Sequence, residues 1–553
     1  MRPKVSRVFS IFILLSREVY AAAVPRPIAD RTTCRKTQVA ILGAGIAGVT
    51  AAQAVSNASI NDFLLIDRND YIGGRVVNTP FGKKTDGSPY TIELGANWIQ
   101  GLGSDSGPEN PIWTLSKKYS INSTFSNYSA ILSYDETGQV DYLHLLDEYD
   151  QAYEEVQKQS GYILNLNLQD TSVRTGLSLA EWNPQGNSHA QAAEWWGWDF
   201  NAAQPPELSS LLFGVAGDNA TFNHFSDENF FVTHQNGLNE FIQREAHQFL
   251  KKNDPRLLLN TTVASIHYSD DSVEVKFDNG DCVDAEHVIC TFSVGVLQNN
   301  VVKFKPELPL WKRDAIQSFN MGIYTKIFMQ FNETFWDEDT QFFLYADPYE
   351  RGKYPVFQSL SGPDFHEGSH IVFVTVAAGQ AQVVEKQSDE ETQAQVMEVL
   401  RSMFPDINVP DPIAFMYPRW SEEKWAYGSY SNWPVGVTLE KHQNLRANVD
   451  RLWFAGEASS SLWFGYMQGA WFEGQEVGQR VAGMLGARVP VKNRGSMRHY
   501  NLLHGTSFAD GYDGEHGWNV DTFADQQLRK QARGKARRKA QETTATVHEQ
   551  IPL

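Results

Sequence analysis

The sequence of 553 residues contains only three cysteines, Cys34, Cys282 and Cys290. So few cysteines exclude a fold built on a disulfide framework, and their spacing lacks the paired pattern of a structural zinc site. No stretch approaches the about 20 apolar residues that a membrane-spanning helix needs. Basic side chains are also scarce, with 47 against 66 acidic ones and a formal net charge of −19. This deficit argues against nucleic acid as a partner and suits a cationic ligand.

The two ends of the chain differ in composition from the rest. Residues 1–23 run from basic through apolar to small side chains, which is the layout of a secretory signal peptide. We therefore expect a secreted protein, with an intracellular location as the alternative if this leader does not function. Six Asn-X-Ser/Thr sequons fit a glycosylated surface: Asn57, Asn122, Asn127, Asn219, Asn260 and Asn332. Residues 491–553 are expected to form a disordered tail, in which residues 529–539 are strongly basic.

A glycine-rich motif lies near the start of the expected mature chain. An apolar run at residues 37–42 predicts a buried parallel strand, and Gly-x-Gly-x-x-Gly follows it directly before a helix-forming stretch. The first glycine permits a tight turn, the second lets the backbone approach a pyrophosphate, and the third allows close helix–strand packing. A second strand at residues 63–66 ends in an aspartate that can accept hydrogen bonds from ribose hydroxyls. The predicted dinucleotide-binding residues are Gly43, Ala44, Gly45, Ile46, Ala47, Gly48 and Asp67. The motif alone does not choose between FAD and NAD.

The segments that follow favour FAD. Two glycines precede Arg75, whose guanidinium can reach a pyrophosphate. Residues 92–98 then read Ile-Glu-Leu-Gly-Ala-Asn-Trp. Together these segments resemble the flavin amine oxidase family, in which they flank the FAD. The resemblance extends over roughly residues 37–490.

The resemblance implies further FAD contacts far along the chain. Val263 matches a strand residue whose backbone meets the adenine, and Glu457 matches the glutamate that contacts the pyrophosphate–ribityl region. Met467 opens a helix that would face the flavin ring, and Trp420 is expected to pack near the isoalloxazine. Monoamine oxidases attach the flavin through a cysteine that residues 459–464 lack. We therefore expect FAD to be bound noncovalently.

Within that family the sequence is similar to plant-type secreted polyamine oxidases, on residues 304–309, 321–328 and 428–436. The resemblance implies oxidation of a carbon–nitrogen bond in spermine- or spermidine-type amines to an imine. The imine hydrolyses to an aldehyde and a smaller amine, while O2 becomes H2O2. Two alternatives remain open. One is a flavin amine oxidase for a monoamine, an N-acetylpolyamine or an L-amino acid, and the other is a noncatalytic flavin-binding protein.

Lys326 is the predicted catalytic residue. It alternates with Tyr324 on an apolar strand pattern, so both side chains are expected on one face. A lysine within such a strand needs a polar task, and the resemblance implies that it holds a water beside the flavin. The resemblance also implies that Tyr430 and Tyr466 face each other in front of the flavin, where their rings can attract an ammonium group.

The polyamine-binding pattern is incomplete in this sequence. Plant-type enzymes resembling it line their substrate tunnel with two glutamates. The first position is Gln100 here, and the second is Asp199, followed by Phe200. One full charge is therefore missing from the predicted tunnel, and we expect weaker selection of spermine and spermidine.

The expected fold class is α/β, with a Rossmann-like FAD-binding domain and an α+β substrate-binding domain. The FAD-binding domain is predicted to be discontinuous and to consist of residues 37–117, 228–298 and 448–490. Residues 118–227 and 299–447 are predicted to build the substrate-binding domain. The sequence does not indicate an oligomeric state.

Overall fold

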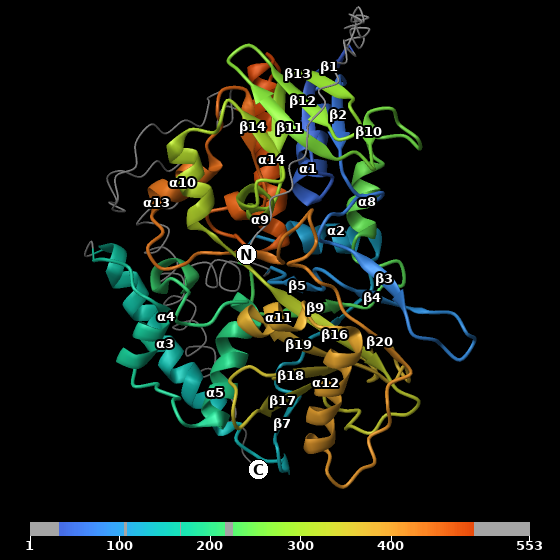
Figure 1. The fold of residues 1–553 in the computed structure, drawn as a ribbon, viewed down its shortest axis with the longest axis vertical. Coiled ribbons are helices and arrows are strands. Elements are labelled where there is room, and N and C mark those ends of the chain that lie inside the picture. Colours follow the sequence, from blue (N-terminus) through green and yellow to red (C-terminus); the bar gives the residue numbers. More distant parts are fainter. Residues whose placement is uncertain (1–32, 104–107, 166–167, 216–224, 491–553) are drawn as a thin grey trace, which may run out of the picture. The chain divides into compact units, whose positions relative to one another are not determined.

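The computed structural model describes residues 33–103, 108–165, 168–215 and 225–490. The predicted signal peptide, the predicted tail and the Asn219 sequon lie outside these ranges. Within them, no helix combines the length and apolar character that crossing a bilayer requires. The described chain has a mixed α/β fold built on two large sheets, which confirms the predicted fold class (Figure 1). The predicted domain boundaries stay predictions.

The larger sheet has the strand order β10–β2–β1–β13–β12–β11–β14, and β22 also pairs with β13. Its strands are β1 (Arg35–Leu42), β2 (Phe63–Ile66), β10 (Leu257–Leu258), β11 (Val263–Tyr268), β12 (Val273–Phe277), β13 (Cys282–Cys290), β14 (Lys303–Lys305) and β22 (Leu452–Phe454). Strand β1 runs parallel to both β2 and β13. All of residues 39–42 and all of β2 are buried, as expected for parallel strands covered on both faces. The two strands predicted from the sequence are therefore parallel neighbours in this mixed sheet.

Helix α1 (Ile46–Asn57) follows β1 and packs along α14 (Met467–Met484), as Figure 1 shows. Glycines let the two backbones approach closely. A Cβ atom at Gly474 would lie 2.2 Å from the carbonyl oxygen of Ala47, and one at Gly478 would lie 2.6 Å from that of Ala51. This contact brings the beginning and the end of the described chain together beside the larger sheet.

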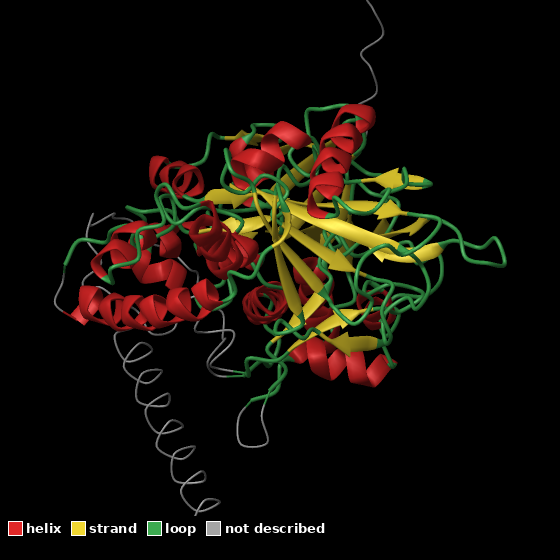
Figure 2. Cartoon of the chain, turned by 90° about the horizontal axis from the view of Figure 1, so that it is seen from below, coloured by secondary structure: helices red, strands yellow, loops and turns green. Residues whose placement is uncertain are grey.

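The second sheet has the order β20–β16–β19–β18–β17–β7–β8. Its strands are β7 (Ile131–Asp135), β8 (Gly138–Gln139), β16 (Tyr324–Gln330), β17 (Phe342–Ala346), β18 (Val356–Ser359), β19 (Ile371–Ala377) and β20 (Ala414–Met416). One face packs against α12 (Asp389–Met403) in an apolar core, and Figure 2 shows strands gathered between helices. The other face carries an aromatic cluster that includes Phe200 and Tyr324. This second face is the one that reaches the candidate site.

Shorter elements complete the described fold. The strands are β3 (Asn78–Phe81), β4 (Tyr90–Glu93), β5 (Trp98–Gln100), β6 (Ser123–Phe125), β9 (Asn229–Val232), β15 (Asn320–Gly322) and β21 (Tyr430–Asn432). The helices are α2 (Pro111–Tyr119), α3 (His144–Asn165), α4 (Val173–Leu179), α5 (Ser188–Glu194), the π-helix η1 (Trp195–Asp199), α6 (Phe200–Ala202), α8 (Glu240–Ala246), α9 (Val294–Gln298), α10 (Leu310–Ser318), α11 (Ala378–Val384), α13 (Leu439–Arg446) and the 3-10 helix η2 (Glu457–Ser459). Strand β5 pairs with β9, and β21 pairs with β15, which positions their cavity-lining residues.

A disulfide joins Cys34 to Cys282. It links the chain just before β1 to the first residue of β13, and these strands already pair in parallel from Arg35 onward. Cys290 is a buried free thiol. The low cysteine count excluded a disulfide framework, but it did not indicate this single cross-link.

We expect the disulfide to stabilise the folded chain because it closes a loop of 248 residues in the unfolded state. Replacing Cys282 by serine should lower the free energy of unfolding by about 3 kcal/mol. Urea unfolding of Cys282→Ser, with Cys290→Ser as the control, measures this effect. Equal stability of Cys282→Ser and the parent protein would contradict it.

Candidate active site

A cavity of about 510 Å³ lies where segments from both large sheets and both ends of the described chain meet. Most of the predicted site residues line it: Gly43, Gly45, Ile46, Ala47, Asp67, Arg75, Gln100, Phe200, Val263, Tyr324, Trp420, Tyr430, Glu457, Tyr466 and Met467. Four predicted site residues do not line it: Ala44, Gly48, Asp199 and Lys326. The cavity has two parts, a polar region at the end of β1 and an aromatic region beside β16.

The polar region begins at the turn between β1 and α1. Gly43 has a positive φ of 106°, and its N–H donates to the carbonyl oxygen of Ile66 at 2.7 Å. A Cβ atom at Gly48 would lie only 1.7 Å from the carbonyl oxygen of Gly43, so the turn requires glycine there. The N-terminus of α1 therefore reaches the cavity without side chains in its way, and its free N–H groups can bind an anion.

Asp67 stands at the end of β2 and lines the same region. Its carboxylate accepts hydrogen bonds from the N–H of Ala44 at 2.6 Å and from the N–H of Asn69 at 2.8 Å. Burial raises the pKa of this carboxyl, and the two backbone N–H groups partly oppose the shift. Ala44 thus acts by orienting Asp67 rather than by lining the cavity.

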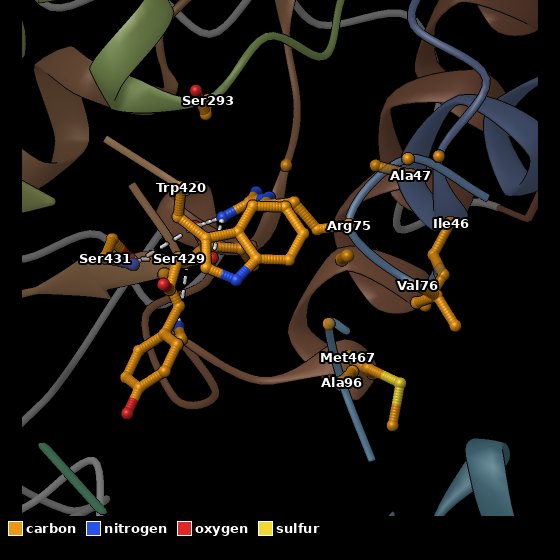
Figure 3. A pocket seen from close by; sticks show the side chains of 18 of the residues that line it. Ile46, Ala47, Arg75, Val76, Ala96, Ser293, Trp420, Ser429, Ser431 and Met467 are labelled. Atoms are coloured by element: carbon orange, nitrogen blue, oxygen red, sulfur yellow. Dashed lines mark hydrogen bonds and ion pairs between the residues drawn. The ribbon is translucent and has the colours of Figure 1, made fainter. Parts of the chain in front are cut away.

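Arg75 and Glu457 join the two ends of the described chain across the cavity. The Arg75 guanidinium donates to Glu457 Oε1 at 3.0 Å and to the carbonyl oxygen of Ser429 at 2.8 Å. Glu457 also accepts from Ser431 Oγ at 2.5 Å, from Ser431 N at 3.2 Å and from Gly465 N at 2.8 Å. Figure 3 shows Arg75 pointing toward Ser429 beside Trp420. This ion pair fixes a cation at the centre of the cavity wall.

The polar region fits the phosphate and ribose parts of FAD. The glycine turn and the α1 N-terminus supply donors, Asp67 supplies an acceptor for hydroxyl groups, and Arg75 supplies a positive charge. Apolar and aromatic side chains continue the wall beyond Arg75, and they include Trp420 and Met467. A long cofactor with a charged centre and a flat ring matches this sequence of surfaces.

The aromatic region is built by side chains from four elements. The ring centroids of Tyr324 and Tyr430 lie 6.1 Å apart, and those of Phe200 and Tyr324 lie 6.0 Å apart. The ring centroid of Trp98 lies 6.1 Å from that of Phe200, and Trp98 completes the wall. Burial raises the pKa of both tyrosines, so these phenols stay neutral in the ordinary pH range. Neutral aromatic faces suit an aliphatic chain that carries an amine.

Lys326 lies behind the wall of the cavity rather than in it. The side chain is 1% exposed, and its Nζ donates to the carbonyl oxygen of Gly95 at 2.9 Å and to Asn97 Oδ1 at 3.1 Å. Burial lowers the pKa of Lys326 from 10.5 to about 7, and Glu93 partly opposes the shift. Gly95, Ala96 and Asn97 themselves line the cavity, so Lys326 contacts the site through this segment.

Asp199 is not brought to the cavity. It is 2% exposed, and its carboxylate forms two hydrogen bonds with Arg351, at 2.6 and 2.9 Å. Arg351 also contacts Glu194 at 2.9 Å, and Glu194 pairs with Arg174. The predicted substrate carboxylate is therefore committed to a buried ion network. Among the described residues that line the cavity, only Asp67 and Glu457 carry carboxylates.

Several contributing residues are not predicted by the sequence. Arg351 lies in the turn between β17 and β18, and nothing in its local sequence indicates a pairing with Asp199, 152 positions away. Asn97 and Glu93 do lie inside the motif at residues 92–98. The sequence therefore indicates their neighbourhood, but it does not indicate the hydrogen bond from Lys326 to Asn97 or the electrostatic interaction of Glu93 with Lys326.

Comparisons with known proteins agree with this geometry. The family described as "Flavin containing amine oxidoreductase" matches residues 46–482, and the chain belongs to this family. It is 36% identical to "Polyamine oxidase 1" of Zea mays over 460 residues, which cover 79% of this chain and 88% of that protein. It is 34% identical to "Polyamine oxidase 7" of Oryza sativa subsp. japonica, with 86% and 99% covered.

The fold is also similar to solved structures. A solved structure of wild-type putrescine oxidase bound to putrescine superposes with a TM-score of 0.64 at 18% sequence identity, and the match covers 82% of this chain and all of that one. At this identity the likeness shows the fold alone. Membership of the flavin family confirms the predicted cofactor, FAD.

Proposed function

We propose that this protein is an FAD-dependent polyamine oxidase. One observation carries the proposal: a neutral aromatic chamber and the Arg75 region belong to one cavity, and a buried lysine lies behind residues 95–97 of its wall. Bound FAD would be held noncovalently, and it would supply the acceptor for a hydride from the carbon beside the amine nitrogen. The similarity to plant polyamine oxidases supports the substrate class.

The residues of this chain would bind and orient the amine. Tyr324, Tyr430 and Phe200 enclose the aliphatic chain, and their ring faces favour an approaching ammonium group. The Tyr430 hydroxyl donates to the carbonyl oxygen of Asn201 at 2.9 Å, which fixes its ring in the chamber. Lys326 would take a proton at Nζ or hold a water, since its lowered pKa keeps much of it neutral near pH 7. Water would then hydrolyse the imine product.

The test is to purify the yellow protein and to screen a panel of amines for O2-dependent H2O2 release. The panel should contain spermine, spermidine, an N-acetylpolyamine, a monoamine and an L-amino acid. Identification of the aldehyde formed from spermine would show which carbon is oxidised. Peroxide release with polyamines is the expected result, and a flavin-loaded protein that oxidises no amine would support a noncatalytic flavin-binding protein instead.

The two predicted polyamine-binding positions, Gln100 and Asp199, should differ in their effect on substrate selectivity. Gln100 lines the cavity, so Gln100→Glu adds a carboxylate that a second ammonium group can approach. We expect this change to lower the Michaelis constant for spermine about fivefold, since partly exposed pairs contribute about 1 kcal/mol. Steady-state kinetics at constant ionic strength measures this effect.

Asp199→Asn is the matched control for Gln100→Glu. Because Asp199 is buried against Arg351, its loss should lower stability and leave the spermine-to-spermidine preference unchanged. An unchanged Michaelis constant in Gln100→Glu would remove the selectivity argument. A changed preference in Asp199→Asn would return Asp199 to the substrate site.

We also propose that the protein is secreted and glycosylated. The Cys34–Cys282 disulfide supports this location, because such bonds persist in oxidising compartments. Four sequon asparagines are exposed, which leaves them accessible to the attachment of a glycan: Asn57, Asn122, Asn260 and Asn332. A mobility shift of the protein from culture medium after glycosidase treatment would test this proposal.

A further inference from the structure

The segment that separates Lys326 from the cavity also carries a buried carboxylate. The Nζ of Lys326 has two hydrogen-bond acceptors, Gly95 O and Asn97 Oδ1. A neutral amine has two N–H groups and one lone pair, whereas an ammonium has three N–H groups. Two acceptors therefore satisfy the neutral amine completely and leave its lone pair available to accept a proton.

Glu93 stands at the end of β4, two residues before Gly95, and is 4% exposed. Its Oε1 accepts a hydrogen bond from the N–H of Leu238, which holds the carboxyl group in place. Its Oε2 is buried and has no hydrogen-bond partner. A buried, unpartnered carboxylate oxygen is costly unless a nearby positive charge or a bound proton compensates it.

The surroundings of this pair offer few other charges. Across β3 the position opposite Glu93 is Asn78, and across β19 the position opposite Lys326 is Thr375. The rings of Trp98 and Phe328 lie 5.7 and 5.8 Å from the lysine Nζ. All four neighbours are uncharged.

Two further titratable or charged groups lie nearby. Tyr324 precedes Lys326 by two residues on the same strand, and burial keeps its phenol neutral. Arg75 is close in the fold, because its backbone carbonyl accepts a hydrogen bond from Ala96 N at 3.3 Å. The Arg75 guanidinium, however, forms its ion pair with Glu457. Glu93 is thus the group left to respond to a proton on Lys326.

We propose that Glu93 is a positioning residue for the oxidation of amines, which acts through Lys326 by supplying the countercharge that lets this buried lysine accept a proton. With Glu93 ionised and Lys326 neutral, the pair carries one negative charge. A proton relayed from the cavity to Nζ through a bound water gives a pair with no net charge. The inference rests on the proposed function, because it assigns the proton a role in that reaction.

Burial and charge act in opposite directions on the two groups. Burial raises the pKa of Glu93, and Lys326 opposes that shift. Burial lowers the pKa of Lys326, and Glu93 opposes that shift in turn. Removing the Glu93 charge should therefore lower the pKa of Lys326 further, and the lysine should stay neutral to a lower pH.

The first test measures stability and needs no activity. Lys326 has a pKa near 10.5 in the unfolded chain and a lower pKa in the folded protein. Its contribution to the free energy of unfolding therefore increases as the pH rises through the pKa of the folded state. The free energy of unfolding of the holoenzyme is compared with that of its Lys326→Met derivative from pH 5 to 10. The same comparison is then made in the Glu93→Gln background. We expect the pH at which the difference begins to rise to move down by about one unit.

Glu93→Gln keeps an oxygen for the N–H of Leu238, so the variant should fold. Glu385→Gln is the matched control, because Glu385 is also buried beside β16 but bonds Thr325 Oγ1 at 2.5 Å on the opposite face. Glu93→Asp keeps the charge, so the pH at which the stability difference begins to rise should stay near that of the parent protein. The proposal would be overturned if this pH did not change in Glu93→Gln, or if it moved equally in Glu385→Gln.

The second test follows the pH dependence of anaerobic flavin reduction by a saturating amine. The acid limb of the rate profile should move to lower pH in Glu93→Gln and stay in place in Glu385→Gln. An acid limb that does not move in Glu93→Gln contradicts the proposal, since a purely structural role would change the rate without moving the limb. If no amine is oxidised, the proposed function fails, and the unfolding comparison still decides whether Glu93 and Lys326 are coupled.

Discussion

Replacement of Lys326 by methionine should slow anaerobic reduction of the bound flavin by about 10²- to 10⁴-fold, the usual range for loss of a positioned acid–base group. Methionine has nearly the same length but cannot accept a proton. Because Lys326 does not line the cavity, the chamber and the bound FAD should be retained. Stopped-flow absorbance of the flavin with spermidine measures the rate, and the absorption spectrum of the purified protein measures cofactor content.

The rate of flavin reduction should also change with pH in a defined direction. In the proposed mechanism the neutral form of Lys326 accepts the proton, so the parent rate should rise with pH through the region near 7, where burial places the lysine pKa. Lys326→Met should lose that rise. It should also cost some stability, because Gly95 O and Asn97 Oδ1 lose their donor.

Lys312→Met is the control for removing a buried lysine. Lys312 Nζ donates to the carbonyl oxygens of Leu445 at 2.6 Å and Ala447 at 2.7 Å, away from the cavity lining. This variant should unfold more easily but reduce its flavin at close to the parent rate. A loss of less than tenfold in Lys326→Met, with the acid limb intact, would remove Lys326 from the chemistry.

The parts of the site that the sequence predicts are those whose chemistry is local. The β1–α1 turn is specified by three glycines, and the contact between Gly48 and Gly43 O shows why no other residue would fit. Asp67 follows directly from the end of β2, so its place at the cavity needs no information beyond the strand register. Alternation along β16 likewise places Tyr324 and Lys326 on one face of the sheet.

The parts that the sequence does not predict depend on partners distant in the chain. Asp199 lies at the sequence position where a substrate-binding carboxylate is predicted. Arg351, from the turn between β17 and β18, pairs with this carboxylate, which does not line the cavity. The position of Lys326 behind Gly95 and Asn97 depends on how β16 packs against the segment between β4 and β5. Alternation within one strand gives the face on which a side chain lies, but not what covers that face.

The same reasoning about distant partners gives the second large effect, at Glu457. This carboxylate accepts hydrogen bonds from Arg75, from the backbone and hydroxyl of Ser431, and from Gly465 N. Glu457→Ala would remove all of these acceptors at a site that is 6% exposed. We expect the free energy of unfolding to fall by about 3 kcal/mol, because the donors of Ser431 and Gly465 lose their acceptor and the partly exposed Arg75 loses its charge partner.

Loss of FAD should accompany this destabilisation. Without Glu457 the Arg75 guanidinium is no longer held at the cavity wall, and the segments around Ser431 and Gly465 lose their common anchor. We expect Glu457→Ala to purify with little flavin, as its absorbance near 450 nm would show. Glu457→Gln is the matched variant: its amide oxygen can still accept from a backbone N–H, so it should fold more stably than Glu457→Ala while binding FAD more weakly than the parent protein. Full flavin content in Glu457→Ala would mean that the glycine turn and Asp67 hold the cofactor without the C-terminal segment, contrary to the geometry of the cavity.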